Sequence, residues 1–326
     1  MIRRAFLVGS AALLAAPLAA RAQTARKMAR IGRLSPLSAE VDVPFTAAFR
    51  QALQELGWAD GRSFTLVSRF AEGRAERLPQ LAASLVQDGV DVILAGSNPG
   101  ALAAKNATKT VPIVMVTTGD PIGGRIVSSL AHPGGNVTGL TALGGALSAK
   151  RLEALKDALP GIQRVAVLAN PTAPYTGPFL DEREAVARDL GLKLQVHEAR
   201  SPRDLEAAFA AMARERAEAV MVLTDVMFIT ERRAIVDLGT RHRLPGVYFD
   251  RQFVDAGGLM FYGATLVHMY RRAAVYVDRI LKGARPADLP IEQPTIFELV
   301  VNLRAARSLG LKLPPAFLAR ADALIE

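Results

Sequence analysis

The segment VDVILAGSNP, residues 90–99, contains the pattern that decides the fold. Its apolar, β-branched run from 90 to 95 is typical of a strand that is buried on both faces, as in a parallel sheet. Gly96, Ser97 and Asn98 end this run, and Pro99 falls just inside a predicted helix, where proline is favoured. The segment therefore predicts a parallel strand that leads directly into a helix.

The same pattern occurs three more times along the chain. Apolar runs at 113–116, 165–169 and 220–223 each end at small polar residues, and helix-like sequence follows. In open α/β sheets, ligands bind beyond the carboxyl ends of the strands. Because two such strand ends fall in each half of the chain, the sequence predicts an α/β protein. Its two doubly wound parallel-sheet lobes would face each other across a cleft.

The predicted elements also divide the chain between the two lobes. We expect the first lobe to contain residues 29–140 and about 264–292, and the second to contain 141–263 and about 297–326. Segments near 137–140, 257–263 and 297–301 predict three crossing strands between the lobes. Three crossings make a hinge, which suits closure of the lobes on a ligand.

The first 22 residues have the three parts of a secretory signal peptide. Arg3 and Arg4 precede an apolar run at 5–16, and small residues at 20 and 22 precede Gln23. That run is shorter than the roughly 20 residues of a transmembrane helix. The chain has no cysteine, which excludes disulfides, thiolate metal sites and a lipid-modified N-terminal cysteine. We therefore expect a periplasmic protein without a lipid anchor, cleaved before Gln23 and exported by the Sec or the twin-arginine route.

The charge distribution argues against a nucleic-acid partner. The formal net charge is +9, but basic residues are spread along the chain and lie near acidic ones on the predicted helices. Binding to nucleic acid requires clustered basic residues, whereas interspersed charges are typical of a solvated surface. We expect no nucleic acid among the partners.

A set of short motifs extends from about residue 29 to the C-terminal region. They include EGR at 72–74, GDP at 119–121, AHPGGNVTG at 131–139, KRLE at 150–153 and AGGL at 256–259. Together they resemble the ABC-transporter substrate-binding family whose better-known members bind tryptophan or tyrosine. The resemblance implies the type I periplasmic binding protein fold, a small organic ligand such as an amino acid, and an ABC permease in the inner membrane as partner.

Candidate ligand contacts in the first lobe lie at the ends of its predicted strands: Ser35, Ser97, Asn98, Thr117 and Thr118. Free backbone N–H groups at the helix start after Ser97 would favour a carboxylate. Ordinary helix capping is the alternative role for Ser97 and Asn98. Asp120, which precedes Pro121, is interpreted as a helix cap rather than a ligand contact.

Candidate contacts in the second lobe are Asn170, Asp225 and Tyr248. Asp225 would suit an ammonium group, so an anion site in one lobe and a carboxylate in the other would together bind a zwitterion. Tyr175, Phe228 and Phe249 are candidates for an apolar wall, and core packing is the alternative for the two phenylalanines.

Other functions find little support among the motifs. The four histidines lack metal-binding spacing, and the chain has no nucleophile elbow, phosphate loop or dinucleotide fingerprint. We expect no cofactor, no metal and no enzyme activity. A two-lobed enzyme such as an epimerase or glycosyltransferase is the alternative, and the sensing core of a repressor is a third hypothesis. The leading hypothesis is a monomeric extracytoplasmic receptor that binds a small organic ligand in the cleft for an ABC importer.

Overall fold

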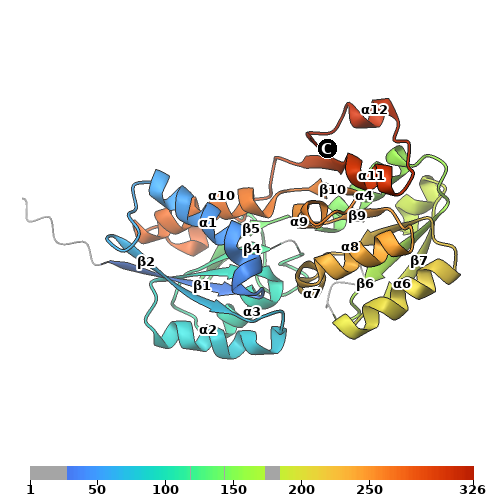
Figure 1. Cartoon of the computed structure of the whole chain (residues 1–326). Helices are drawn as coiled ribbons and strands as arrows, with labels where there is room; N and C mark the ends of the chain where they lie inside the picture. The colour runs from blue at the N-terminus through green and yellow to red at the C-terminus, as the bar shows by residue number, and fades with distance from the viewer. Residues whose placement is uncertain (1–27, 118, 143, 173–183) are drawn as a thin grey trace, which may run out of the picture.

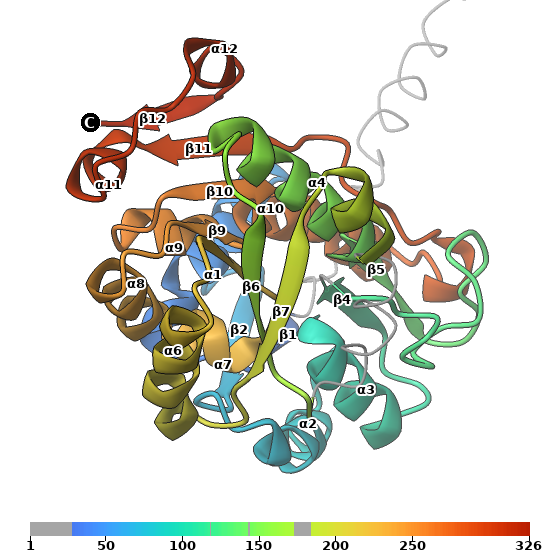
Figure 2. The same ribbon diagram turned by 90° about the vertical axis from the view of Figure 1, so that its right-hand side faces the viewer.

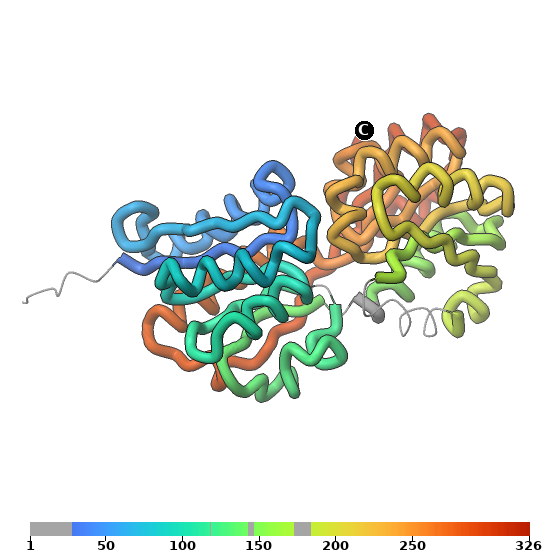
Figure 3. The backbone as a smooth tube through the Cα atoms, turned by 90° about the horizontal axis from the view of Figure 1, so that it is seen from below, coloured from blue at the N-terminus to red at the C-terminus, as the bar shows by residue number. Residues whose placement is uncertain are grey.

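Two β-sheets, each covered by helices, lie side by side in the structure (Figures 1 and 3). The structure is a computed structural model, and it describes residues 28–117, 119–142, 144–172 and 184–326. The predicted signal peptide at 1–22, Thr118 and Tyr175 lie outside the described residues. The predicted α/β class with two parallel-sheet lobes is confirmed.

The first sheet has five strands among the described residues, in the order β2-β1-β3-β4-β5, and all of its strand pairs are parallel. The strands are β1 (Ala29–Ser35), β2 (Phe64–Phe70), β3 (Val92–Gly96), β4 (Ile113–Thr117) and β5 (Val137–Thr141).

Helices cover both faces of the first sheet. In β3, Val92 and Leu94 pack toward one face, and Ile93 and Ala95 pack toward the other. This alternation explains why the whole run is apolar, since both faces of the strand are buried. The helices are α1 (Ala39–Glu55) and α10 (Leu266–Leu281), which pack together, and α2 (Leu78–Gln87) and α3 (Ser97–Ala107), which pack together on the opposite face (Figure 1).

The second sheet has the order β12-β11-β10-β9-β8-β6-β7 in the described part of the chain. Its pairs are parallel except β10 with β11, which is antiparallel. The strands are β6 (Arg164–Ala169), β7 (Lys193–Glu198), β8 (Ala219–Val222), β9 (Gly246–Tyr248), β10 (Met260–Gly263), β11 (Glu298–Asn302) and β12 (Ala323–Ile325).

The second lobe contains helices that follow its own strands and one helix that follows β5 of the first lobe. They are α4 (Gly144–Ala158), α6 (Leu205–Arg214), α7 (Val226–Thr230), α8 (Arg232–Arg241), α9 (Arg251–Asp255), α11 (Leu303–Ser308) and α12 (Pro315–Leu318). The last two helices lie with β11 and β12 at one end of this lobe (Figure 2). Short 3-10 turns occur at Ala75–Arg77, Pro202–Asp204 and Pro286–Asp288.

The chain passes between the lobes three times: from β5 to α4, from β10 to α10, and from residue 292 to β11. No described strand is shared by the two sheets: β5 pairs in the first sheet, whereas β10 and β11 pair with each other in the second. The crossings are therefore the short segments beside these strands. Because β10 and β11 are antiparallel, the chain leaves the second sheet after β10 and re-enters it before β11 at the same end of the sheet.

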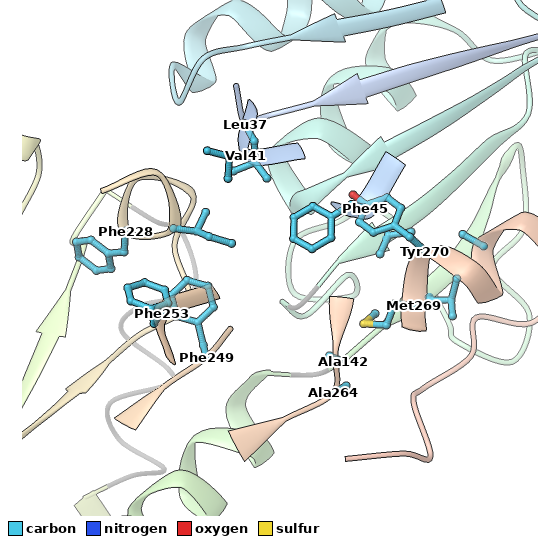
Figure 4. Close-up of a cluster of buried hydrophobic side chains, with 14 of the residues drawn as sticks. Leu37, Val41, Phe45, Ala142, Phe228, Phe249, Phe253, Ala264, Met269 and Tyr270 are labelled. Carbon is cyan, nitrogen blue, oxygen red and sulfur yellow. The ribbon is translucent and has the colours of Figure 1, made fainter. Parts of the chain in front are cut away.

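One buried apolar cluster contains residues of both lobes (Figure 4). Val41 and Phe45 of α1 belong to it, together with Phe228 of α7 and Phe249 and Phe253 near α9. The lobes also approach each other where a side chain on Gly73 would lie 3.5 Å from the hydroxyl of Thr230. The ends of the strands in the two lobes are thereby brought close together.

Candidate functional site

Ser97 stands at the junction between β3 and α3 in an unusual backbone conformation. Its φ is +64°, and its hydroxyl accepts a hydrogen bond of 3.3 Å from the backbone N–H of Gly100. The hydroxyl thus caps the helix, while the left-handed backbone is uncommon for a residue other than glycine. Strain of this kind is often retained at binding sites, where the surrounding structure enforces it.

Asn98 and Thr117 each have a buried polar atom without a hydrogen-bond partner in the described part of the chain. The amide nitrogen of Asn98 donates to the carbonyl of Asp120 at 3.0 Å, which leaves its Oδ1 free. The Thr117 hydroxyl, at the end of β4, is buried in the same way. Because an unsatisfied buried group costs about 1–3 kcal/mol, both atoms are candidates for contact with a ligand or an ordered water.

In the second lobe, Asp225 follows β8 and begins α7. Its Oδ1 accepts from the backbone N–H of Met227 at 2.8 Å, and its Oδ2 accepts from the Asn170 amide at 3.1 Å. Asn170 is itself oriented by Thr172, whose backbone N–H and hydroxyl donate to its Oδ1. Burial raises the pKa of Asp225 above its usual value. An ammonium group beside this carboxylate would stabilise its charged form.

Ser97, Asn98 and Asp225 line one pocket, to which both lobes contribute walls. Further lining residues include Val116 and Gly119 of the first lobe and Thr224, Val226, Ile229 and Phe249 of the second, with Leu266 between the lobes. The volume is about 60 Å³, whereas pockets that bind small organic molecules usually measure several hundred Å³. A ligand as large as an amino acid therefore requires the lobes to separate before it can enter.

Four of the predicted contacts are not among the residues that line this pocket: Ser35, Thr117, Asn170 and Tyr248. Asn170 acts only through its hydrogen bond to Asp225. Ser35 donates to Asp42 at 2.7 Å inside the first lobe, and its side chain is fully buried. Tyr248 stacks on Phe253 with 4.7 Å between the ring centroids, in the core of the second lobe. Phe228 is likewise a core residue with no exposed surface, whereas Phe249 is buried and also lines the pocket.

A buried ionic network beneath the pocket was missed by sequence reasoning. Arg33 in β1 pairs with Asp42 of α1 and donates to the hydroxyl of Tyr270 at 2.8 Å. Its guanidinium also lies 4.6 Å from the centroid of the tyrosine ring. An added side chain on Gly96 would meet this network, 2.8 Å from the Tyr270 oxygen. The network thus fixes the backbone that leads into Ser97. The available signal was an arginine inside an apolar strand with an aspartate nine residues later.

The described residues contain no group of three or more histidine, cysteine or acidic side chains that could hold a metal ion. Within the same residues, no helix is both long enough and apolar enough to span a bilayer.

The family assignment comes from comparison with known proteins. The family model described as ABC transporter substrate binding protein matches residues 40–325. The chain belongs to this family. The substrate-binding protein is also 24% identical over 265 residues to the tyrosine-binding protein of Clostridioides difficile, which covers 81% of this chain and 76% of that relative.

Solved structures share the fold of this substrate-binding protein. A conserved domain protein from Vibrio cholerae has a TM-score of 0.85 and 27% identity, with coverage of 91% of this chain and 100% of that one. The ABC domain in complex with L-Trp from Streptococcus pneumonia has a TM-score of 0.82 and 24% identity, covering 90% of this chain and 100% of that one. The predicted family, fold and role as an ABC solute-binding protein are confirmed.

Proposed function

We propose that this substrate-binding protein binds one zwitterionic amino acid, or a related compound, between its lobes. The observation that carries the proposal is that Ser97 and Asn98 of one lobe and Asp225 of the other line the same pocket. The N-terminal end of α3 is suited to a carboxylate, and Asp225 is suited to an ammonium group. Two similar proteins, a tyrosine-binding protein and a domain in complex with L-Trp, support aromatic amino acids as first candidates.

In this function the protein does not alter the ligand chemically. It releases the ligand to an ABC permease. Membership of a substrate-binding family supports this role over a two-lobed enzyme such as an epimerase or glycosyltransferase. We further propose that the protein acts as a monomer. We also propose that it has no nucleic-acid partner, because its basic residues lie among acidic ones.

The extracytoplasmic role of the family also supports export to the periplasm. Residues 1–22 carry the sequence pattern of a signal peptide, so we propose cleavage before Gln23. Mass spectrometry of protein recovered from the periplasm should find Gln23 as the N-terminal residue. Recovery of exported protein that begins at Met1 would contradict this proposal.

The ligand class can be tested by a thermal-shift screen with compounds that differ in one charge. L-Tyrosine would be compared with tyramine, which lacks the carboxylate, and with 3-(4-hydroxyphenyl)propionate, which lacks the ammonium group. L-Tryptophan would be compared with tryptamine and indole-3-propionate. A zwitterion at 100 times its Kd should stabilise the protein by about 2.7 kcal/mol, and both partners that lack one charge should stabilise it less. Equal stabilisation by a compound with one charge would contradict zwitterion recognition.

A further inference from the structure

A second and larger pocket lies between the lobes on the side of α1 and α9. It measures about 360 Å³, which falls within the range of pockets that bind small molecules. Pro44 and Phe45 of α1 form its wall in the first lobe, and residues of α9 together with Glu298 form the wall in the second. Leu266 alone among the lining residues is shared with the pocket at Ser97 and Asp225. The two pockets are therefore lined by almost entirely different residues.

Acidic side chains dominate the polar lining of the second pocket. Asp250, Asp255 and Glu298 line it, and Arg251 is the one basic residue among the lining residues. Arg251 pairs only loosely with two of these acids, at 3.6 Å from Asp255 and 3.9 Å from Glu298. Asp250 is almost fully buried and makes no ion pair with a described residue. Arg232 and Arg151 favour the charged form of Asp250 from outside the lining. The lining itself carries three acidic side chains and one basic one, and this excess of negative charge would attract a cation.

Most of the remaining lining residues are apolar, and one polar side chain among them lacks a hydrogen-bond partner. Phe45 is buried on the wall of α1, while Val267 is 39% exposed at the rim. The side-chain nitrogen of Gln252 is buried without a hydrogen-bond partner in the part of the chain that the structure describes. This amide is therefore a hydrogen-bonding group of the lining that is still open to an occupant.

We propose that this pocket is a second binding site, specific for a compact organic cation with an apolar body. The carboxylates bind the charged group, and Phe45 and Val267 pack against the body. Because the walls belong to both lobes and to the crossing before α10, an occupant contacts the protein beside its hinge. Occupancy then depends on the angle between the lobes, as required for coupling between two sites.

Benzamidine is a suitable probe, because benzamide and benzoate have nearly the same shape but carry no charge or a negative charge. Calorimetric titration of the wild-type protein should detect benzamidine binding, and the two analogues should bind at least about tenfold more weakly, as expected when a charge-assisted hydrogen bond is lost. Benzamide binding as strong as that of benzamidine would overturn the proposal.

The site can be located with matched valine variants. Val267→Arg places a positive charge at the rim and should abolish benzamidine binding, whereas Val196→Arg, at a similarly exposed valine in the edge strand β7, should leave it unchanged. Asp255→Asn should weaken binding by about tenfold, since it removes one carboxylate.

Asp225→Asn distinguishes the two pockets, because Asp225 lines only the first. Benzamidine should bind this variant as it binds the wild type. If Asp225→Asn removes benzamidine binding, or if Val267→Arg leaves it intact, the probe occupies the first pocket and the proposal is wrong.

Discussion

The Arg33–Asp42 pair is a buried ion pair whose network lies against the backbone of Gly96, directly before Ser97. Arg33 has no exposed surface, and its charge is balanced by Asp42 and by the hydroxyl and ring of Tyr270. Burial raises the pKa of Tyr270 to about 12, so its hydroxyl remains neutral at physiological pH. The loss of Asp42 would leave a buried cation without a counterion, which is much more costly than the loss of a surface pair.

We predict that Asp42→Asn lowers the free energy of unfolding by about 3–5 kcal/mol, because it removes one partner of a buried ion pair. Urea denaturation followed by circular dichroism would measure the change. The matched control is Glu206→Gln, which breaks the exposed Arg241–Glu206 pair and should cost less than about 1 kcal/mol. Similar losses in the two variants would show that the buried network has no special role in stability.

Asp250 predicts a specific dependence of stability on pH. Burial raises the pKa of its carboxyl from 3.8 to about 6, while Asp255 opposes its charge and Arg232 and Arg151 favour it. Because the folded state binds the proton more tightly than the unfolded state, this group stabilises the fold below pH 4. That stabilisation is lost as the pH rises through about 6.

Asp250→Asn should therefore be more stable than the wild type at pH 7, by about 1–3 kcal/mol, and similar to it at pH 4. Asparagine is an equally good N-cap, so the cap of α9 is retained. Urea titrations at both pH values would measure this difference. Asp237→Asn, at an exposed aspartate of α8, is the control. A variant that is no more stable than the wild type at pH 7 would contradict the prediction.

At the scale of elements, β5 depends on a glycine. Gly139 pairs with Met115 of β4 and has a φ of +131°, and a side chain there would lie 2.2 Å from the carbonyl oxygen of Met115. Alanine cannot fit without moving the edge strand, because the clash is with backbone atoms. The strand directly precedes the first crossing between the lobes, so its displacement would also affect the hinge.

We predict that Gly139→Ala destabilises the protein by more than about 2 kcal/mol, since it combines backbone strain with overpacking. Gly134→Ala is the control, because Gly134 also has a positive φ of 66° but has open space around it. Alanine there should cost only the roughly 1–2 kcal/mol of a left-handed conformation. Chemical denaturation of both variants would test the difference, and equal losses would show that the contact with Met115 is not limiting.

The apolar runs identified the strands correctly because strands buried on both faces leave little choice of residue, as at Val92 to Ala95. The polar residues after β3 and β8 could also be placed, since strand ends in parallel sheets lie at one edge. Tyr248 could not be distinguished from Phe249 in this way. Both rings pack on Phe253 in one core cluster, but Phe249 also lines the pocket. The sequence does not say which of two adjacent aromatic residues lies at the cleft. The antiparallel β10–β11 pair and the Arg33 network depend on contacts between distant segments, which local patterns do not encode.

At the scale of the whole molecule, the lobes share one buried apolar cluster that includes residues of α1 and α7 (Figure 4). The pocket between the lobes is small. Ligand entry must break the contact between the lobes, and the lobes should then close around the bound ligand without returning fully to the packing described here. Three short crossings permit such a hinge motion.

We predict that the ligand-free protein opens at this hinge in solution, so that a saturating amino-acid ligand reduces the radius of gyration measured by small-angle X-ray scattering. The ligand would be the amino acid with the largest thermal shift in the screen. Scattering curves that superimpose with and without this amino acid would contradict closure.

The central claim is that Ser97 and Asp225 bind opposite ends of one ligand, and calorimetric titration of that amino acid tests it most directly. Asp225→Asn should weaken binding by about 2–4 kcal/mol, because the ammonium group would be left unpaired. Ser97→Gly, which tolerates the positive φ, should cost only about 0.5–1.5 kcal/mol, because the backbone donors of α3 remain. If both folded variants bind the amino acid with wild-type affinity, the ligand does not lie between these residues.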